Sequence, residues 1–269
     1  MNKRWEIAIV GGTGGMGQVF TKELKAHADI IIISRSLEKA KKFSEKLGVR
    51  YGILKDCNTA DIIIISVPIK NTYEICQKLF KFVKPNSLIM DISAVKTHLK
   101  KIKLEIPNRV SYISIHPLFG PEGTFKDYNV ILVPLKGDNW LSIIQELFDN
   151  IGAITSTATV EEHDTIMSKI QVAHHFIYLL LASYLNDTQI SPKFFTHSFQ
   201  KTLETFRRIE KNLPAIMEIQ QENPYAESTR KEINLITQKL ISLDPEKIHK
   251  LLSKIEMFKK IYLLKKENS

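Results

Sequence analysis

Three glycines at a fixed spacing form the first candidate binding element of the chain. Gly12, Gly14 and Gly17 follow the apolar run Ile7–Val10 and fit the pattern G-x-G-x-x-G. In such a turn the first glycine permits a tight bend, the second lets backbone approach a pyrophosphate, and the third lets the next helix pack closely. A helix expected over Gly14–His27 would direct its N-terminal N–H groups and positive dipole end toward the phosphates. A glycine-rich turn without a ligand is the alternative. The residues predicted to bind a dinucleotide here are Gly12, Thr13, Gly14, Gly15, Met16 and Gly17.

The end of the second expected strand bears on which dinucleotide binds. Asp29–Ser34 contains a continuous β-branched run, which is typical of a strand buried in a parallel sheet. A carboxylate at its tip would bind the ribose 2′-hydroxyl of NAD, but here the residues are Ser34, Arg35 and Ser36, with Lys39 one turn later. A guanidinium pairs with a phosphate, whereas a carboxylate would repel it. We therefore predict NADP, with NAD as an open alternative. A solvated arginine at the start of a helix would also explain Arg35.

One histidine stands where a proton acceptor would be useful. His116 follows the expected strand Val110–Ile115 and begins a stiff loop, Pro117–Gly123, bounded by proline and glycine. At the carboxyl end of a strand beside a dinucleotide, it could take a proton from a substrate hydroxyl while a hydride leaves. It must be neutral to do so, and we expect activity to rise with pH through one ionisation near the usual pKa of about 6.5, or somewhat above it if an anionic substrate raises it. A loop histidine held by hydrogen bonds is the alternative.

These residues need a sheet that brings them to one edge. Strands and helices alternate through residues 1–157, which predicts an α/β, doubly wound, Rossmann-type dinucleotide-binding domain. The buried run Asp61–Pro68 should end at the ligand crevice, so Ser66, Val67 and Pro68 are expected beside the nicotinamide half of the cofactor. Further strands are expected near 51 and 154 and over 87–91, 110–115 and 130–133, with helices over 37–47, 71–82 and 140–150.

From residue 158 onward every expected element is a helix. Thr159 and Glu162 fit a capping box, and a long helix should run from there to about Leu185. It carries a stripe of side chains four residues apart: His163, Met167, Gln171 and His175. The stretch Phe176–Leu185 is apolar all round, so we expect a second copy of the chain to cover it. Residues 158–269 are therefore predicted to form an all-α substrate and dimerisation domain, with further helices over 192–209, 213–221, 225–243 and 245–264.

The composition excludes several classes of protein. The net charge is +9, but lysines and arginines are spread through the helices without interleaved aromatics, which favours an anionic cofactor and substrate over nucleic acid. Cys57 and Cys76 are the only cysteines and show no metal-ligand spacing, so we expect reduced thiols and no metal site. There is no signal peptide pattern and no apolar run of membrane-spanning length. We predict a cytoplasmic protein that does not bind a membrane.

Taken in order and spacing, the motifs resemble those of prephenate dehydrogenases, which act in the tyrosine branch of aromatic amino-acid biosynthesis. The resemblance covers nearly the whole chain, and the loop at His116 is most similar to the branch that reads His-Pro-(Met/Leu)-Phe-Gly-Pro. It implies oxidative decarboxylation of prephenate to 4-hydroxyphenylpyruvate and CO2 with transfer of a hydride to the nicotinamide. The motifs that carry it are residues 11–17, 66–68, 91–96, 116–121 and 161–164, followed by Met167, Gln171 and His175.

The resemblance also implies roles for single residues. His116 would be the catalytic histidine, hydrogen-bonded to the ring 4-hydroxyl, and Lys96 would offer a positive charge to cofactor or substrate. Arg208 would bind a substrate carboxylate, and His175 would also contact the substrate. Arg207 competes with Arg208, and because adjacent side chains point about 100° apart on a helix, only one should reach the site. A solvated helix cation is the alternative for either arginine.

One position departs from the family pattern. The family serine that assists the catalytic histidine corresponds to Ala94, and a serine stands one residue earlier, at Ser93. Either Ser93 takes over through a shifted turn, or water supplies the hydroxyl, or the substrate differs. Arogenate dehydrogenase, or another NADP-dependent oxidoreductase on a small acid, therefore remains an alternative. A non-catalytic NADP-binding regulator is a third hypothesis, although it would need neither His116 nor Arg208. Few residues precede Trp5, so no fused mutase domain is expected.

Overall fold

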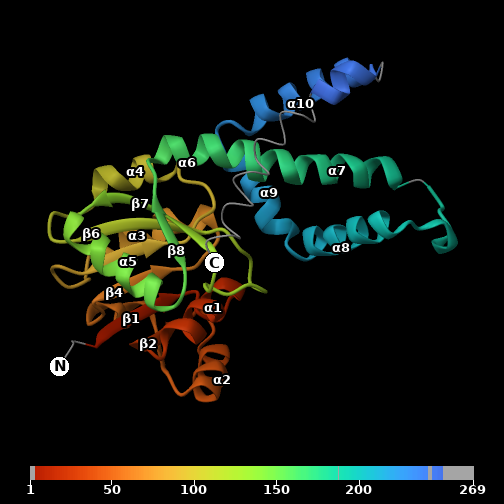
Figure 1. Cartoon of the computed structure of the whole chain (residues 1–269). Helices are drawn as coiled ribbons and strands as arrows, with labels where there is room; N and C mark the ends of the chain where they lie inside the picture. The colour runs from red at the N-terminus through yellow and green to blue at the C-terminus, as the bar shows by residue number, and fades with distance from the viewer. Residues whose placement is uncertain (1–3, 187, 242–243, 251–269) are drawn as a thin grey trace.

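Eight strands form one sheet in the computed structural model, which describes residues 4–186, 188–241 and 244–250 (Figure 1). The strand order is β3-β2-β1-β4-β5-β6-β7-β8, and every neighbouring pair is parallel except β6 and β7. The strands are β1 (Trp5–Val10), β2 (Ala28–Ile33), β3 (Arg50–Gly52), β4 (Ile62–Ile65), β5 (Leu88–Asp91), β6 (Ser111–Pro117), β7 (Asn129–Lys136) and β8 (Ile154–Thr157).

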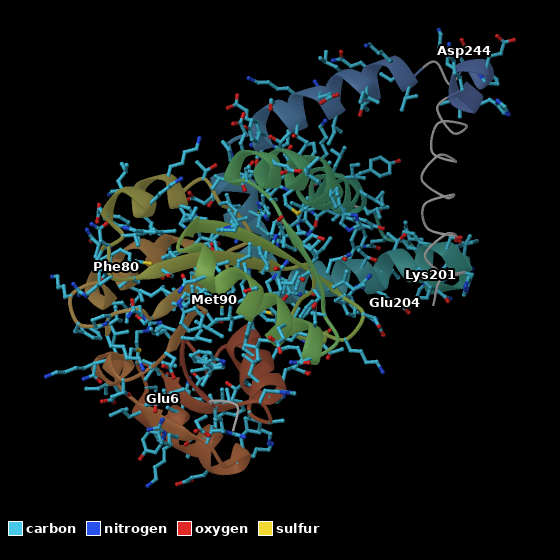
Figure 2. The ribbon with its side chains drawn as sticks, turned by 60° about the vertical axis from the view of Figure 1, so that its left-hand side comes forward. Glu6, Phe80, Met90, Lys201, Glu204 and Asp244 are labelled. Carbon is cyan, nitrogen blue, oxygen red and sulfur yellow. The ribbon has the colours of Figure 1, made fainter. Side chains whose placement is uncertain are left out.

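The isoleucine runs bury both faces of this sheet, because successive side chains of a strand point to opposite sides. In β4, Ile62 and Ile64 belong to the core beneath α1 (Gly15–Leu24) and α5 (Leu141–Asn150). Ile63 and Ile65 belong to the core beneath α3 (Ile69–Leu79) and α4 (Leu99–Glu105). Figure 2 shows Met90 of β5 inside this layered part of the molecule. The doubly wound Rossmann-type fold is therefore confirmed. The covering helices are α1 (Gly15–Leu24), α2 (Leu37–Leu47), α3 (Ile69–Leu79), α4 (Leu99–Glu105) and α5 (Leu141–Asn150).

The antiparallel pair of β6 and β7 departs from the expected pattern. Residues 118–128 join the two strands without a helix, and Pro117 of β6 pairs with Val130 of β7. A parallel pair would need a long crossover connection, whereas an antiparallel pair can be joined directly. The loop that follows His116 therefore stays at the same edge of the sheet as the histidine itself.

The helical part begins at the expected capping box. Thr159 Oγ1 accepts a hydrogen bond from the Glu162 N–H at 3.1 Å, and α6 (Val160–Met167) starts there. A π-helical turn at Ser168–Val172 joins α6 to α7 (Ala173–Leu185). In an α-helix each step of four residues overshoots one turn by about 40°. The wider π turn opposes this drift and keeps the predicted stripe closer to one face.

The remaining helices pack beside α7 (Figure 1). Helix α8 (His197–Lys211) starts later than expected, because Pro192–Phe194 forms a 3₁₀ turn and Thr196 then caps the helix. Figure 2 shows Lys201 and Glu204 on the part of this helix that projects from the sheet domain. Residues 245–250 are helical, and the rest of the helix expected over 245–264 lies outside the described residues. No helix in the described ranges is long and apolar enough to cross a membrane. The three helices are α8 (His197–Lys211), α9 (Leu213–Glu222) and α10 (Ala226–Leu240).

Candidate functional site

The glycine turn between β1 and α1 has room for backbone alone. Gly11 takes a left-handed conformation with φ +80°, one residue before the position expected to make the tight bend. A Cβ atom on Gly12 would lie 2.9 Å from Ile32 Cγ2, and one on Gly17 would lie 2.4 Å from the Gly11 oxygen. Helix α1 starts after Gly14 with no capping side chain. This arrangement fits a pyrophosphate at the N-terminus of α1.

The tip of β2 lies against the same turn. Thr13 Oγ1 is 3.1 Å from Ser34 Oγ, and Ser36 caps α2 by accepting a hydrogen bond from the Lys39 N–H at 3.3 Å. Between these serines the Arg35 side chain is exposed, and among the described residues it has no ion-pair partner. The two hydroxyl groups and the unpaired guanidinium form a small polar, cationic surface beside the turn.

The end of β4 completes this edge. The Ser66 N–H donates to the Val10 oxygen at 2.7 Å, and a Cβ on Gly11 would lie 2.1 Å from the Ser66 oxygen. Pro68 stands just before α3. The structure thus brings Ser66, Val67 and Pro68 directly beside the glycine turn, at the carboxyl edge where dinucleotide ligands bind in such sheets.

His116 lies at the same edge, as the second-to-last residue of β6. A hydrogen bond connects its side chain to the helical part. Its Nδ1 atom is 2.9 Å from Nε2 of His163, and His163 Nδ1 is 2.8 Å from Oδ1 of Asp164. All three residues are buried, with His116 4% exposed. Sequence reasoning placed His163 on a stripe and Asp164 in a motif, but it gave neither residue a role at His116. Their contact spans 47 residues of sequence, so local patterns carry no signal for it.

Burial makes His116 a neutral imidazole. Its pKa lies well below the usual value, first because burial disfavours the charged form and then because Lys96 and His163 lie nearby. Burial also lowers the pKa of His163, against the opposing effect of Asp164. The expectation of a pKa near or above about 6.5 is therefore wrong for the free protein. The neutral form, which can accept a proton, is present across the neutral pH range.

Lys96 is completely buried and does not face an open site. Its Nζ donates to the Ser93 oxygen at 2.7 Å, to Ser114 Oγ at 2.6 Å and to the Ile115 oxygen at 2.8 Å. All three ammonium hydrogens have acceptors inside the protein. In this structure the ammonium group of Lys96 thus bonds to protein oxygens next to His116, and its expected contact with cofactor or substrate stays a prediction.

Ser93 does not replace the family serine at His116. Its hydroxyl donates to Asp91 and lies 3.3 Å from Nε2 of His98. Ala94 packs instead in an apolar cluster that includes Val172 of the π turn. In this structure the hydrogen-bond partner of His116 is His163, a third solution besides Ser93 and water. Among the described residues, no group of three or more histidine, cysteine or acidic side chains is placed to hold a metal.

The two adjacent arginines of α8 face different surroundings. Arg208 is exposed and donates to Thr205 Oγ1 at 3.1 Å. It lies near Glu122, whose pKa is lowered mainly by Lys211 and to a smaller extent by Arg208. Lys211, one turn later, forms an ion pair with Glu122 in the loop after His116. Arg208 thus lies near the loop that follows His116.

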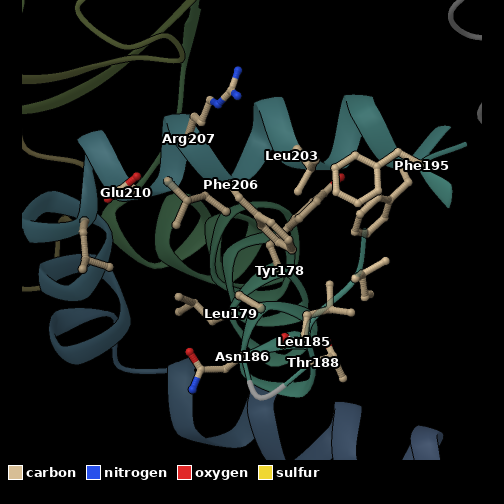
Figure 3. A pocket seen from close by; sticks show the side chains of 15 residues that line it. Tyr178, Leu179, Leu185, Asn186, Thr188, Phe195, Leu203, Phe206, Arg207 and Glu210 are labelled. Atoms are coloured by element: carbon tan, nitrogen blue, oxygen red, sulfur yellow. Dashed lines mark hydrogen bonds between the residues drawn. The ribbon is translucent and has the colours of Figure 1, made fainter. Parts of the chain in front are cut away.

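Arg207 borders a different surface. It lines an open apolar groove of about 550 Å³ between α7 and α8, together with Tyr178 and Phe206. Figure 3 shows its guanidinium directed away from the aromatic side chains that line this groove. Arg207 thus borders the groove, whereas Arg208 lies near the His116 loop.

Two side chains on the predicted stripe are unsatisfied. Gln171 Oε1 and His175 Nδ1 are buried atoms without a hydrogen-bond partner in the described structure. Burial, and then the neighbouring His174, lower the pKa of His175 to about 4. Buried polar atoms normally have a partner, so a neutral imidazole and an amide in this state favour a bound polar molecule or water.

Comparisons with known proteins agree in both halves of the chain. Residues 20–157 match the family described as prephenate dehydrogenase, nucleotide-binding domain, and residues 159–254 match prephenate dehydrogenase, dimerization domain. A probable arogenate/prephenate dehydrogenase of Methanocaldococcus jannaschii is 29% identical over 236 residues, which cover 83% of this chain and 53% of the relative. The T-protein of Haemophilus influenzae is 29% identical over 173 residues, 64% of this chain and 42% of the relative. The chain spans about half the length of these curated relatives.

Solved structures share the fold. Prephenate dehydrogenase from A. aeolicus, in complex with hydroxyphenyl propionate and NAD+, aligns with a TM-score of 0.75 and 19% identity over 99% of both chains. Synechocystis arogenate dehydrogenase aligns with a TM-score of 0.66 and 20% identity over 96% of this chain and 99% of the other. At these identities the likeness supports the architecture of both domains.

Proposed function

Since the chain belongs to the prephenate dehydrogenase family, we propose that it oxidatively decarboxylates prephenate to 4-hydroxyphenylpyruvate and CO2 with NADP. The observation that carries the proposal is a buried, neutral His116 at the same sheet edge as the glycine turn. A bound nicotinamide would supply the acceptor for the hydride of the ring carbon that bears the hydroxyl group. His116 accepts the hydroxyl proton as the hydride leaves. Loss of the ring carboxylate as CO2 makes the ring aromatic, and the phenolate oxygen then takes the proton back from His116.

The residues around His116 orient and polarise the substrate. Arg208 beside the His116 loop would bind a substrate carboxylate, and His175 with Gln171 would hydrogen-bond the rest of the molecule. Arg207 is the competing candidate for the carboxylate. Because aromatisation supplies much of the driving force, positioning and electrostatic stabilisation are the main tasks of the protein.

Arogenate is the second candidate substrate. One relative carries both substrates in its name, and one structural neighbour is an arogenate dehydrogenase. Arogenate differs from prephenate in its side chain, which bears an amino group in place of the keto oxygen. The candidate groups for distinguishing the two side chains are His175 of α7 and Arg208 of α8.

The cofactor proposal rests on the tip of β2. Arg35 is exposed and unpaired in the described structure, and hydroxyl groups flank it on both sides. A 2′-phosphate would fit this surface, and the backbone turn suits a dinucleotide of either kind. The A. aeolicus neighbour was solved with NAD+, so NAD is the alternative.

We also propose that two copies form a homodimer through the helical part. Helix α7 has no buried residue, even though it is largely apolar. Its side chains Ile177, Leu180 and Tyr184 are 51%, 48% and 76% exposed. An apolar surface of this kind favours a protein interface. The matching domain is described as a dimerization domain.

Two buried thiols, Cys57 and Cys76, suit a reducing compartment and support a cytoplasmic location.

The first test is an assay at 340 nm with NADP and prephenate, and then with arogenate. We expect turnover with prephenate, and the variant His116→Asn should lose a factor of roughly 10²–10⁴ in kcat, the usual contribution of a general base. Because the pKa of His116 is lowered, kcat/KM should stay level from about pH 7 downward to below 6.5 and fall only at more acidic pH. A folded His116→Asn protein with near-native activity would refute the mechanism.

Arg208→Ala should raise KM strongly and change kcat less, because a dianionic substrate loses its cationic partner. Arg207→Ala is the matched control, since it removes the same charge one residue away on the face that borders the groove. Steady-state kinetics on both variants measure the difference. Damage in Arg207→Ala with a harmless Arg208→Ala would transfer the role to Arg207.

Arg35→Asp should weaken NADP binding by roughly 10- to 100-fold and leave NAD binding nearly unchanged, since a charge-assisted pair contributes about 1.5–3 kcal/mol. Lys46→Asp makes the same charge change near the far end of α2 and should affect neither cofactor. Fluorescence titrations give the dissociation constants. An Arg35→Asp protein with unchanged preference would contradict the assignment of NADP.

Leu180→Glu should shift the protein toward monomers, because a charge buried in an apolar interface is costly. Leu104→Glu is the control, because Leu104 is 87% exposed on α4, outside the helical part. Sedimentation at micromolar concentration distinguishes the two. A stable monomer for the unmodified chain would exclude the homodimer.

A further inference from the structure

We propose that His163 and Asp164 are positioning residues that hold His116 in one tautomer, with a lone pair on Nε2 for the substrate proton. This inference rests on the proposed function, in which His116 accepts that proton. It assigns a role to a buried series of hydrogen bonds that runs from His116 of β6 through His163 to Asp164 of α6, here called the His–His–Asp series.

The argument starts at Asp164, which is an ionised acceptor. Its Oδ1 accepts the Lys96 N–H at 2.8 Å, and its Oδ2 accepts the Thr97 hydroxyl at 2.6 Å. These bonds, together with His163, hold the pKa of Asp164 below its usual value despite burial. A carboxylate has no hydrogen to donate, so the atom facing it at 2.8 Å, His163 Nδ1, must carry one.

The next step follows from the chemistry of a neutral imidazole, which carries one hydrogen. If the hydrogen of His163 is on Nδ1, its Nε2 is an acceptor. His116 Nδ1 lies 2.9 Å from that acceptor and must therefore be the donor. His116 is then neutral with its hydrogen on Nδ1, and its Nε2 holds a lone pair. No described residue forms a hydrogen bond with this Nε2.

This orientation matches the reaction that His116 is proposed to perform. The substrate O–H bond breaks, its electron pair stays on oxygen, and an N–H bond forms at His116 Nε2. The positive charge on the new imidazolium is stabilised through the Nδ1–H bond to His163, whose own Nδ1–H points at the Asp164 carboxylate. Loss of the orienting carboxylate from an imidazole can cost up to about 10⁴ in kcat in another enzyme class.

The hydrogen bonds from His116 through His163 to Asp164 also explain why alanine can stand at position 94, where the family has serine. The position of the family serine carries no hydroxyl, and Ser93 is engaged with Asp91. His163 supplies the hydrogen-bond acceptor to Nδ1 from the helical part. The base is thereby oriented by the other domain.

The first experiment is ¹⁵N NMR of the imidazole rings in the full-length protein without ligands. Spectra of His116→Gln and His163→Gln assign the two rings among the eight histidines. We expect hydrogen on Nδ1 in both rings at pH 7, although a free histidine favours Nε2–H. Hydrogen on Nε2 of His116 would overturn the proposal. This readout does not depend on substrate, so it stands apart from any failure of the proposed function.

The second experiment compares two replacements at one position. In His163→Gln the side-chain oxygen can accept the His116 Nδ1–H, whereas His163→Phe offers no acceptor. We expect His163→Phe to lose at least about tenfold in kcat with little change in KM and to shift the His116 tautomer, and we expect His163→Gln to retain most of both. Equal effects of the two variants would refute a positioning role.

Two further variants complete the test. Asp164→Asn can keep the bonds to Lys96 and Thr97 while it removes the charge, and it should lower kcat at unchanged KM. His27→Gln, on the exposed end of the segment between α1 and β2, should behave as the unmodified protein. An Asp164→Asn protein with native kcat would show that the charge of the carboxylate plays no part in positioning His116.

Discussion

Lys96 is completely buried, and its ammonium must find an acceptor for each of its three hydrogens. It finds them on the turn after β5 and on β6, at Ser93, Ser114 and Ile115. Leaving such a charge unpaired inside a protein costs several kcal/mol, so the two strand ends are held at a fixed distance. His116 directly follows Ile115, and its position in the site depends on this anchor.

The same segment joins the two halves of the molecule. The backbone N–H of Lys96 and the hydroxyl of Thr97 both donate to the carboxylate of Asp164 in α6. The Asn223 amide, just after α9, donates to the backbone carbonyl oxygen of Asp164 at 3.0 Å. Glu218 of α9 also accepts the Lys70 N–H at the start of α3. The contacts of Asp164 are buried or partly buried, whereas the contact of Glu218 with Lys70 and the ion pair of Lys211 with Glu122 are exposed. Orientation of the helical part is thus coupled to orientation of the base.

Local patterns were sufficient for the elements with strong periodicity. The isoleucine runs and the glycine spacing predicted the parallel strands and the turn, and Thr159 with Glu162 predicted the start of α6. The strand β7 was expected, but its antiparallel direction was not, and neither were the short α4 and the π turn at Ser168–Val172. Each of these depends on what the segment packs against. The pKa of His116 was misjudged for the same reason: a nominal value cannot include burial or the nearby Lys96.

In the proposed reaction, burial of His116 has two opposite consequences for proton transfer. A lowered pKa keeps the imidazole neutral and able to accept, but it also makes the imidazole a weaker base, and general bases work best with a pKa near the operating pH. The Asp164 carboxylate, reached through His163, compensates mainly after the proton has arrived, because its attraction to a cation exceeds its attraction to a neutral ring. Its donors at Lys96 and Thr97 already hold it in place, so little reorganisation is needed when charge develops. An interaction that is stronger in the transition state than in the ground state is the kind that lowers a barrier. In the proposed reaction the carboxylate reached through His163 therefore favours proton transfer, although burial lowers the basicity of His116 in the free protein.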